Sequence, residues 1–150
     1  MSITTIERSA FKSCSKLFQL IIPKSVTLID DDAFDKCTSL IEIEIPSSIT
    51  KINDYVFNKC TSLRKIVIPS SVTKIGKFTF CECNKLNEIL IPSSVTEIGD
   101  NAFRNCSSLK EISIPSSMTE INECTFSGCS SLININIPLS IKVIKNFAFL

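Results

Sequence analysis

The stretch "IPSSVTEIGDNAFRNCSSLKEIS" at residues 91–113 is followed at once by "IPSSMTEINECTFSGCSSLININ" at residues 114–136. The second stretch restates the first with an offset of 23 residues. Proline shows how far this period extends, because the chain carries it only at positions 23, 46, 69, 92, 115 and 138. A regular period of this length is typical of proteins whose repeats stack into a solenoid.

Four further residue types keep the same register, so each occupies a column that runs along the chain. The columns begin at Ile6, Phe11, Cys14 and Leu17 and recur every 23 residues without an insertion or a deletion. Columns in register imply that each repeat packs on the previous one and that stacked repeats share one core. We therefore predict a single solenoid domain over residues 1–150, with about six repeats of 23 residues and no linker.

The first part of each repeat has the pattern of a strand. Leu109, Ile112 and Ile114 are inward positions of a segment that alternates as a half-buried strand does. Pro115 ends this strand, because proline cannot donate a hydrogen bond to a neighbouring strand. A second inward-facing segment follows and ends at the isoleucine column.

The next residues predict a corner and a short helix. The position after the isoleucine column is filled by residues that tolerate a left-handed backbone, namely Asp30, Asn53, Gly76, Gly99 and Asn122. Acidic residues follow in several repeats and suit the N-terminus of a helical turn, where phenylalanine and cysteine then stand at i and i+3. The sequence thus predicts an α/β repeat solenoid, with a parallel sheet on one face and short helical turns on the other.

The segment "CSSLKEISIPSSMTEINECTF" (Cys106 to Phe126) resembles the unit C-x-x-L-x-x-I-x-I-P-x-x-x-x-x-I-x-x-x-x-F of BspA-like leucine-rich repeat proteins. The resemblance extends over essentially the whole chain and implies a leucine-rich repeat solenoid. The chain departs from the usual leucine-rich repeat in one column, where serine replaces the asparagine that follows the strand. That column contains Ser48, Ser71, Ser94, Ser117 and Ser140, and we expect its hydrogen bonds to form a looser ladder.

The resemblance also implies a function. Known members occur on oral bacteria and anaerobic protozoa, often as surface proteins that bind host matrix proteins or other cells. The resemblance therefore implies a non-enzymatic protein-interaction module in adhesion or host-protein binding, with a protein ligand. An intracellular scaffold that binds a cytosolic protein is the alternative, because residues 1–16 show no apolar run of signal-peptide length. The cell surface and the cytoplasm thus both remain open as locations.

No residue pattern predicts catalysis, a cofactor or a metal. The chain has no histidine, which removes the Ser–His arrangement and the commonest zinc ligand. Cysteines at a spacing of C-x22-C lack the short pairing of zinc sites, so we interpret the column as buried, reduced packing residues. Disulfide or metal chemistry remains the alternative. Cys81 and Cys124 lie outside the column and are predicted to be the more reactive thiols.

Charge and hydropathy exclude two classes of partner. The net charge is +1, and the column Lys51, Lys74, Glu97 and Glu120 reverses sign along the stack. Nucleic-acid binding usually needs a continuous basic face, so we predict no nucleic-acid partner. No run approaches the roughly 18 apolar residues of a membrane span, so we predict no membrane insertion.

The outward positions of the predicted strands differ at nearly every repeat, whereas the core columns hardly vary. Variable positions on a regular scaffold are how repeat proteins present a binding surface; free drift of exposed residues is the alternative. The predicted protein-binding residues are Glu42, Glu44, Lys65, Val67, Glu88, Leu90, Glu111 and Ser113.

Neither end of the chain carries the polar cap that usually ends a solenoid. "LFQLII" (Leu17 to Ile22) is predicted to be an apolar edge strand. Two interpretations follow and remain open: the chain is a segment of a longer array, or copies of it stack end to end.

Overall fold

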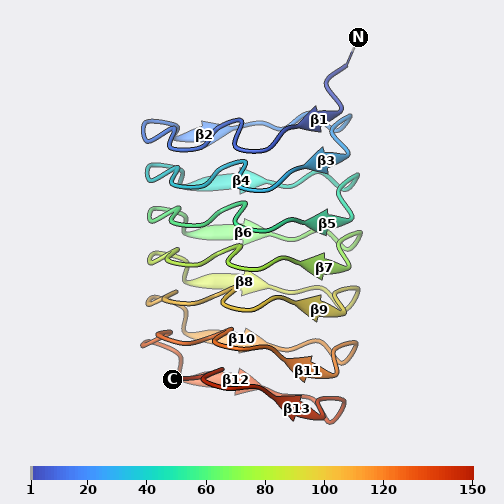
Figure 1. The fold of residues 1–150 in the computed structure, drawn as a ribbon, viewed down its shortest axis with the longest axis vertical. Coiled ribbons are helices and arrows are strands. Elements are labelled where there is room, and N and C mark those ends of the chain that lie inside the picture. Colours follow the sequence, from blue (N-terminus) through green and yellow to red (C-terminus); the bar gives the residue numbers. More distant parts are fainter. Residues whose placement is uncertain (1) are drawn as a thin grey trace.

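The computed structural model describes residues 2–150 and is a stack of rungs, one for each repeat (Figure 1). Each full rung contributes a strand to each of two rows, and β1 (Thr5–Ile6) adds one more strand to the second row. The first strand row consists of β2 (Gln19–Leu20), β4 (Glu42–Glu44), β6 (Lys65–Val67), β8 (Glu88–Leu90), β10 (Glu111–Ser113) and β12 (Asn134–Asn136). The second strand row consists of β1 (Thr5–Ile6), β3 (Leu28–Ile29), β5 (Lys51–Ile52), β7 (Lys74–Ile75), β9 (Glu97–Ile98), β11 (Glu120–Ile121) and β13 (Val143–Ile144).

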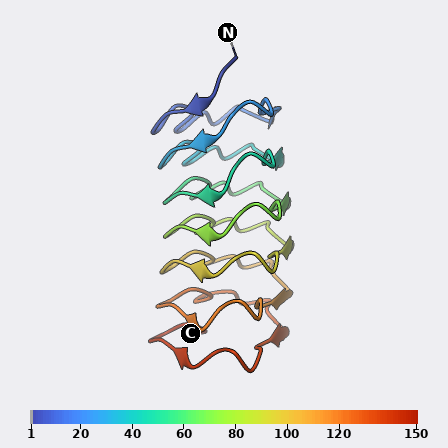
Figure 2. The same cartoon turned by 90° about the vertical axis from the view of Figure 1, so that its right-hand side faces the viewer.

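Neighbouring strands in a row are parallel, and their register equals the repeat. In the first strand row Ile43 pairs with Ile66, and Ile66 pairs with Ile89. The repeat therefore sets the stacking, and equivalent side chains lie in columns. A view from the side shows the rungs following one another in a straight stack, with the two termini at opposite ends (Figure 2).

The predicted core columns are buried, which confirms the assignment of inward and outward positions. The side chains of the phenylalanine column from Phe34 to Phe126 are at most 1% exposed. Their rings stack in parallel, with centroids 5.3 Å apart between Phe80 and Phe103 and 5.5 Å apart between Phe103 and Phe126. Each rung thus closes the core of the next, as expected for units that cannot bury their apolar face alone.

The prediction of short helical turns is wrong, and with it the α/β class. Residues 2–150 contain no helix, and the segment that carries phenylalanine and cysteine consists of consecutive turns. The fold is a β-solenoid of the leucine-rich repeat type.

The backbone hydrogen bonds show why no helix forms. The amide of Asp35 donates to the carbonyl of Asp32 in its own rung, whereas the amide of Phe34 donates to Val56 in the next rung. Paired strands lie about 4.8 Å apart, while an α-helix is about 10 Å across. Helices therefore do not fit one per rung in a straight stack, and the turns instead share their amides with the next rung.

The left-handed residues also lie elsewhere than predicted. Positive φ occurs two positions later, at Asp32, Tyr55, Phe78, Asn101 and Cys124, and again four positions after each of these. Gly76, which was predicted to be left-handed, is not among these residues. A Cβ atom on Gly76 would instead lie 2.6 Å from the carbonyl carbon of Asn53, so glycine allows two rungs to approach closely.

Strand pairing is interrupted at one level in both rows. β8 is not paired with β10, and β9 is not paired with β11, while the turns on the other side continue with Phe103 donating to Thr125. The second strand row is also interrupted between β3 and β5. At both of its interruptions an asparagine bridges the gap: Asn53 donates its side-chain amide to Ile29 (2.8 Å) and Asn122 donates to Ile98 (2.6 Å).

Candidate protein-binding face

The outer face of the first strand row contains all eight predicted binding residues, and each is exposed. The strand geometry produces this, because successive side chains point to opposite sides. In β6, Ile66 points into the core and is 2% exposed, while its neighbour Val67 is 59% exposed. Val67 pairs with Leu90 of β8, which is 74% exposed. Two apolar side chains thus lie side by side on the surface.

Charged and amide groups on this face form contacts along one column. Gln19 donates to Glu42 (3.2 Å), Lys65 lies 3.4 Å from Glu88, and Asn134 donates to Glu111 (3.1 Å). No such contact joins Glu88 to Glu111, which are like charges at the level where pairing is interrupted. Exposed pairs of this kind contribute at most about 1 kcal/mol each, so these contacts leave the face available to a partner.

Two shallow hollows follow the face. One of about 810 Å³ lies over β2, β4 and β6 and is lined by Ile21, Glu44, Val67 and the prolines Pro23 and Pro69. Ile21 is 83% exposed and was not among the predicted binding residues. The prolines were read only as strand ends, and no sequence signal marked them as lining residues.

The second hollow, of about 520 Å³, lies over β8, β10 and β12. Its lining includes Leu90, Glu111, Ser113 and Asn134. Four of the eight predicted residues therefore line this hollow, namely Glu88, Leu90, Glu111 and Ser113. The other four line the first hollow, namely Glu42, Glu44, Lys65 and Val67.

The cysteine column lies in the core from Cys37 to Cys129, whereas Cys14 is exposed. Each buried thiol donates to a phenylalanine carbonyl of the preceding rung, as Cys83 does to Phe57 at 3.1 Å. Burial raises the pKa of Cys83 well above its ordinary value of 9.0. These thiols therefore act as packing groups and hydrogen-bond donors.

The prediction that Cys81 is a reactive thiol is wrong. Its side chain is only 5% exposed, and burial raises its pKa to about 11. Cys124, the other cysteine outside the column, is partly exposed. Among residues 2–150, no group of three His, Cys, Asp or Glu side chains is arranged to hold a metal ion.

The serine column forms hydrogen bonds between rungs at four of its five predicted positions. Ser71 donates to Ile49 (2.6 Å) and Ser94 donates to Val72 (2.7 Å), and Ser48 and Ser117 make the equivalent bonds. The hydroxyl of Ser140 has no partner. The expected looseness is thus confined to the last rung, and these serines have a structural role.

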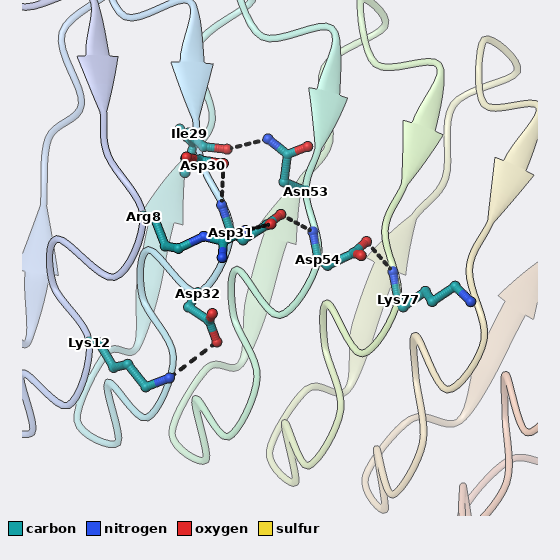
Figure 3. Close-up of polar contacts among 9 residues, drawn as sticks. All are labelled: Arg8, Lys12, Ile29, Asp30, Asp31, Asp32, Asn53, Asp54 and Lys77. Atoms are coloured by element: carbon teal, nitrogen blue, oxygen red, sulfur yellow. Dashed lines mark hydrogen bonds and ion pairs between the residues drawn. The ribbon is translucent and has the colours of Figure 1, made fainter.

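Acidic residues at the corner after the second strand row also join successive rungs (Figure 3). The carboxylate of Asp31 accepts from the amide of Asp54 (3.1 Å), and that of Asp54 accepts from the amide of Lys77 (2.8 Å). Arg8 pairs with Asp31, and Lys12 lies 3.2 Å from Asp32. Carboxylates at this corner were predicted to stabilise helix N-termini, but those of Asp31 and Asp54 satisfy backbone amides of the next rung instead.

Comparison with known protein families agrees with this architecture. The profile of the BspA type leucine rich repeat region matches residues 1–106 and 51–150, with six copies. Comparison with the curated proteins found no match at the level of significance applied.

Several solved structures are similar to the chain. A leucine-rich repeat protein from Bacteroides ovatus is 37% identical with a TM-score of 0.96, over 99% of this chain and 38% of that one. The leucine rich repeat protein of T. pallidum is 34% identical with a TM-score of 0.92, over 96% of this chain and 68% of that one. A leucine rich cell surface protein from Faecalibacterium prausnitzii is 28% identical with a TM-score of 0.50, over 98% of this chain and 60% of that one.

Stacked repeats with a buried phenylalanine column and a variable strand face define a leucine-rich repeat solenoid, a class of generally non-enzymatic scaffolds that bind other proteins. The chain belongs to the BspA-type leucine-rich repeat family. It spans 38% of the length of the Bacteroides ovatus protein. In the part that the structure describes, there is no helix long and apolar enough to cross a lipid bilayer.

Proposed function

We propose that the chain is a surface-displayed interaction module that binds a host protein or another cell, and that the outer face of the first strand row is its binding site. One observation carries the proposal: Val67 and Leu90 are neighbours, are 59% and 74% exposed, and lie among polar side chains. An apolar centre with a polar rim is the usual anatomy of a protein interface.

The scaffold supports this choice of face. The inward positions of the first strand row are isoleucine at nearly every rung, so the backbone of one rung resembles that of the next. The outward positions change from Glu44 to Val67, Leu90 and Ser113 in successive rungs. Repeat proteins commonly vary residues on such a surface to recognise a partner.

Two comparisons support display at the cell surface and a place within a longer array. The Faecalibacterium prausnitzii relative is described as a cell surface protein, which favours display at the surface for this chain as well. The Bacteroides ovatus relative extends well beyond the matched region, so we propose that this solenoid is one part of a longer array.

The location is tested by labelling intact source cells with a reagent that cannot cross the membrane. We expect the protein to be labelled on intact cells to the same extent as after lysis. Protection until lysis would contradict surface display and support the intracellular scaffold.

The binding site is tested with purified chain and immobilised extracellular matrix proteins. We expect saturable binding that is lost in the double variant Val67→Asp, Leu90→Asp. The matched control is Leu28→Asp, Val143→Asp, which replaces two exposed apolar residues of the second strand row with the same two aspartates. Equal loss in both variants would contradict the assignment of the site to the first strand row.

We also propose that the isolated chain self-associates end to end. Phe18 (61% exposed) and Ile21 (83%) lie at the first rung, and Ile133 (76%) and Phe147 (58%) lie at the last. Apolar surface at both ends can be covered by further repeats or by a second copy. Sedimentation should therefore show concentration-dependent association, and a monomer at high concentration would contradict it.

A further inference from the structure

We propose that the partner meets this face with an α-helix lying along the stack, and that the contacting side of that helix is apolar in the middle and basic at both ends. The inference rests on the proposed binding face and names the chemistry of what binds there. Charge, apolar exposure and spacing support it separately.

The first strand row carries an acidic surface. The outward side chains of its strands include four glutamates and one lysine, a net charge of −3, whereas the whole chain has a net charge of +1. Lys24 and Lys110 also line the two hollows and reduce the net charge of the face to −1. The outward side chains of the second strand row include two lysines and two glutamates, a net charge of zero. The proposed face is therefore the acidic one of the two, and charge complementarity favours a basic partner.

The acidic groups surround the apolar pair. Glu44 precedes Val67 in its column, and Ser113 follows Leu90. Glu42 and Glu111 lie in the adjacent column at the same two outer rungs. Glu44 has no hydrogen-bond or ion-pair partner among residues 2–150. Over both columns, the two outer rungs carry glutamate as their only charged residue, and the two central rungs carry the apolar pair beside Lys65 and Glu88, which pair with each other. A partner would match this with basic, apolar, apolar, basic.

The spacing of the rungs selects a helix rather than an extended segment. Successive rungs repeat at about 4.8 Å, and the core rings along the same axis lie 5.2–5.6 Å apart. A helix presents one residue per turn of about 5.4 Å, whereas a strand presents alternate residues about 6.7 Å apart. Over three rung steps, the contacting residues of a helix fall out of register with the rungs by about 2 Å, and those of a strand by about 6 Å.

A four-turn helix therefore faces four successive rungs, with one side chain per turn. The two central side chains contact Val67 and Leu90 and should be leucine or a similar apolar residue. The outer two should be lysine or arginine, whose long side chains reach Glu42 and Glu44 at one end and Glu111 at the other.

The test uses three synthetic alanine-rich peptides of about 15 residues, four helical turns. The first has leucine at the two central contact positions and lysine at the outer two. The second has glutamate in place of both lysines. The third is identical to the first except for a proline in its centre in place of one alanine, which prevents a continuous helix. Binding to the purified chain is measured by fluorescence anisotropy at low and at physiological salt.

We expect the lysine helix to bind at least about tenfold more tightly than either other peptide. Its advantage over the glutamate helix should shrink as salt is raised. Equal affinity of the lysine and glutamate helices would overturn the basic partner, and equal affinity of the helical and proline peptides would overturn the helical one.

Variants of the chain locate the contact. In Glu42→Lys, Glu111→Lys the glutamate helix should bind more tightly than the lysine helix. Glu97→Lys, Glu120→Lys makes the same change of charge on the second strand row and should leave the original order intact. The placement of the helix would be wrong if the first variant kept its preference for the lysine helix and the second variant preferred the glutamate helix.

The double variant Val67→Asp, Leu90→Asp separates this inference from the proposed function. If the variant loses binding to matrix proteins, but the unchanged chain binds all three peptides equally, the helical partner is wrong and the binding face stands. If it retains binding both to matrix proteins and to the lysine helix, both are wrong.

Discussion

The turn side and the strand face of each rung have different roles, although both are formed by the same repeat. On the turn side, the backbone amides, the stacked phenylalanine rings and the buried thiols all join one rung to the next, as Cys83 does to Phe57. On the outer face of the first strand row, side chains change from rung to rung, and only exposed contacts such as Lys65–Glu88 join them. The comparison teaches that stability is concentrated on the side without variation, which leaves the strand face open to change.

The largest expected difference between the two sides appears at high pH. Burial raises the pKa of Cys60, Cys83 and Cys106 well above 9.0, and raises that of Cys37 and Cys129 to about 11. The folded state therefore holds these protons while the unfolded state releases them. Stability from this source is complete below pH 9 and is lost as the pH rises from 9 toward 11 and beyond.

Each such thiol lowers the unfolding free energy by about 1.4 kcal/mol per pH unit in that window. Denaturant unfolding from pH 7 to 11 should show a steep loss in the wild type. The loss should be less steep in Cys83→Ala, because one titrating thiol is gone. A flat profile would contradict burial of the column.

The next effect is the removal of one core ring. Phe103→Ala should cost about 3–5 kcal/mol of unfolding free energy, because it deletes a fully buried aromatic side chain that stacks on two others. Since rungs stabilise only their neighbours, unfolding can then divide into two transitions. The matched change on the strand face is Leu90→Ala, which should cost less than Phe103→Ala. A loss of unfolding free energy under 1 kcal/mol for Phe103→Ala would contradict the assignment of the core.

A smaller effect is expected where strand pairing is interrupted. Asn122→Ala removes the amide that donates to Ile98, leaving a buried carbonyl without this partner at a cost of about 1–2 kcal/mol. Asn134→Ala on the exposed strand face should cost less than about 0.5 kcal/mol. Hydrogen exchange of residues 110–122 should also accelerate in Asn122→Ala. Equal costs for both variants would mean that the asparagine does not join the rungs.

The smallest effect on stability is expected on the binding face itself. Val67→Asp, Leu90→Asp should change the unfolding free energy by less than about 1 kcal/mol, since neither side chain fills the core. The same variant should lose its partner, so thermal unfolding and binding must be measured on one preparation. A large loss of stability would show that the two sides of the rung are not independent.

Particular residues show how far sequence reasoning extends. The inward place of Phe103 and the outward places of Val67 and Leu90 could be predicted, because each follows from a position in the period. The burial of Cys81 could not, because it lies outside every column, and its surroundings come from residues of neighbouring rungs. The role of Asp31 was also misread, since its partner, the amide of Asp54, is 23 residues away.

The sequence by itself determined the period, the solenoid, the core columns and the membership of the strand face. These follow from local alternation and from a register that no insertion disturbs. Only the tertiary structure decided that the remaining segment forms turns, that pairing opens between β8 and β10, and where left-handed residues such as Tyr55 lie. The physical reason is the spacing between rungs: at about 4.8 Å per rung, backbone groups bond to the next rung rather than within a helix, and that competition is not local to any stretch of sequence.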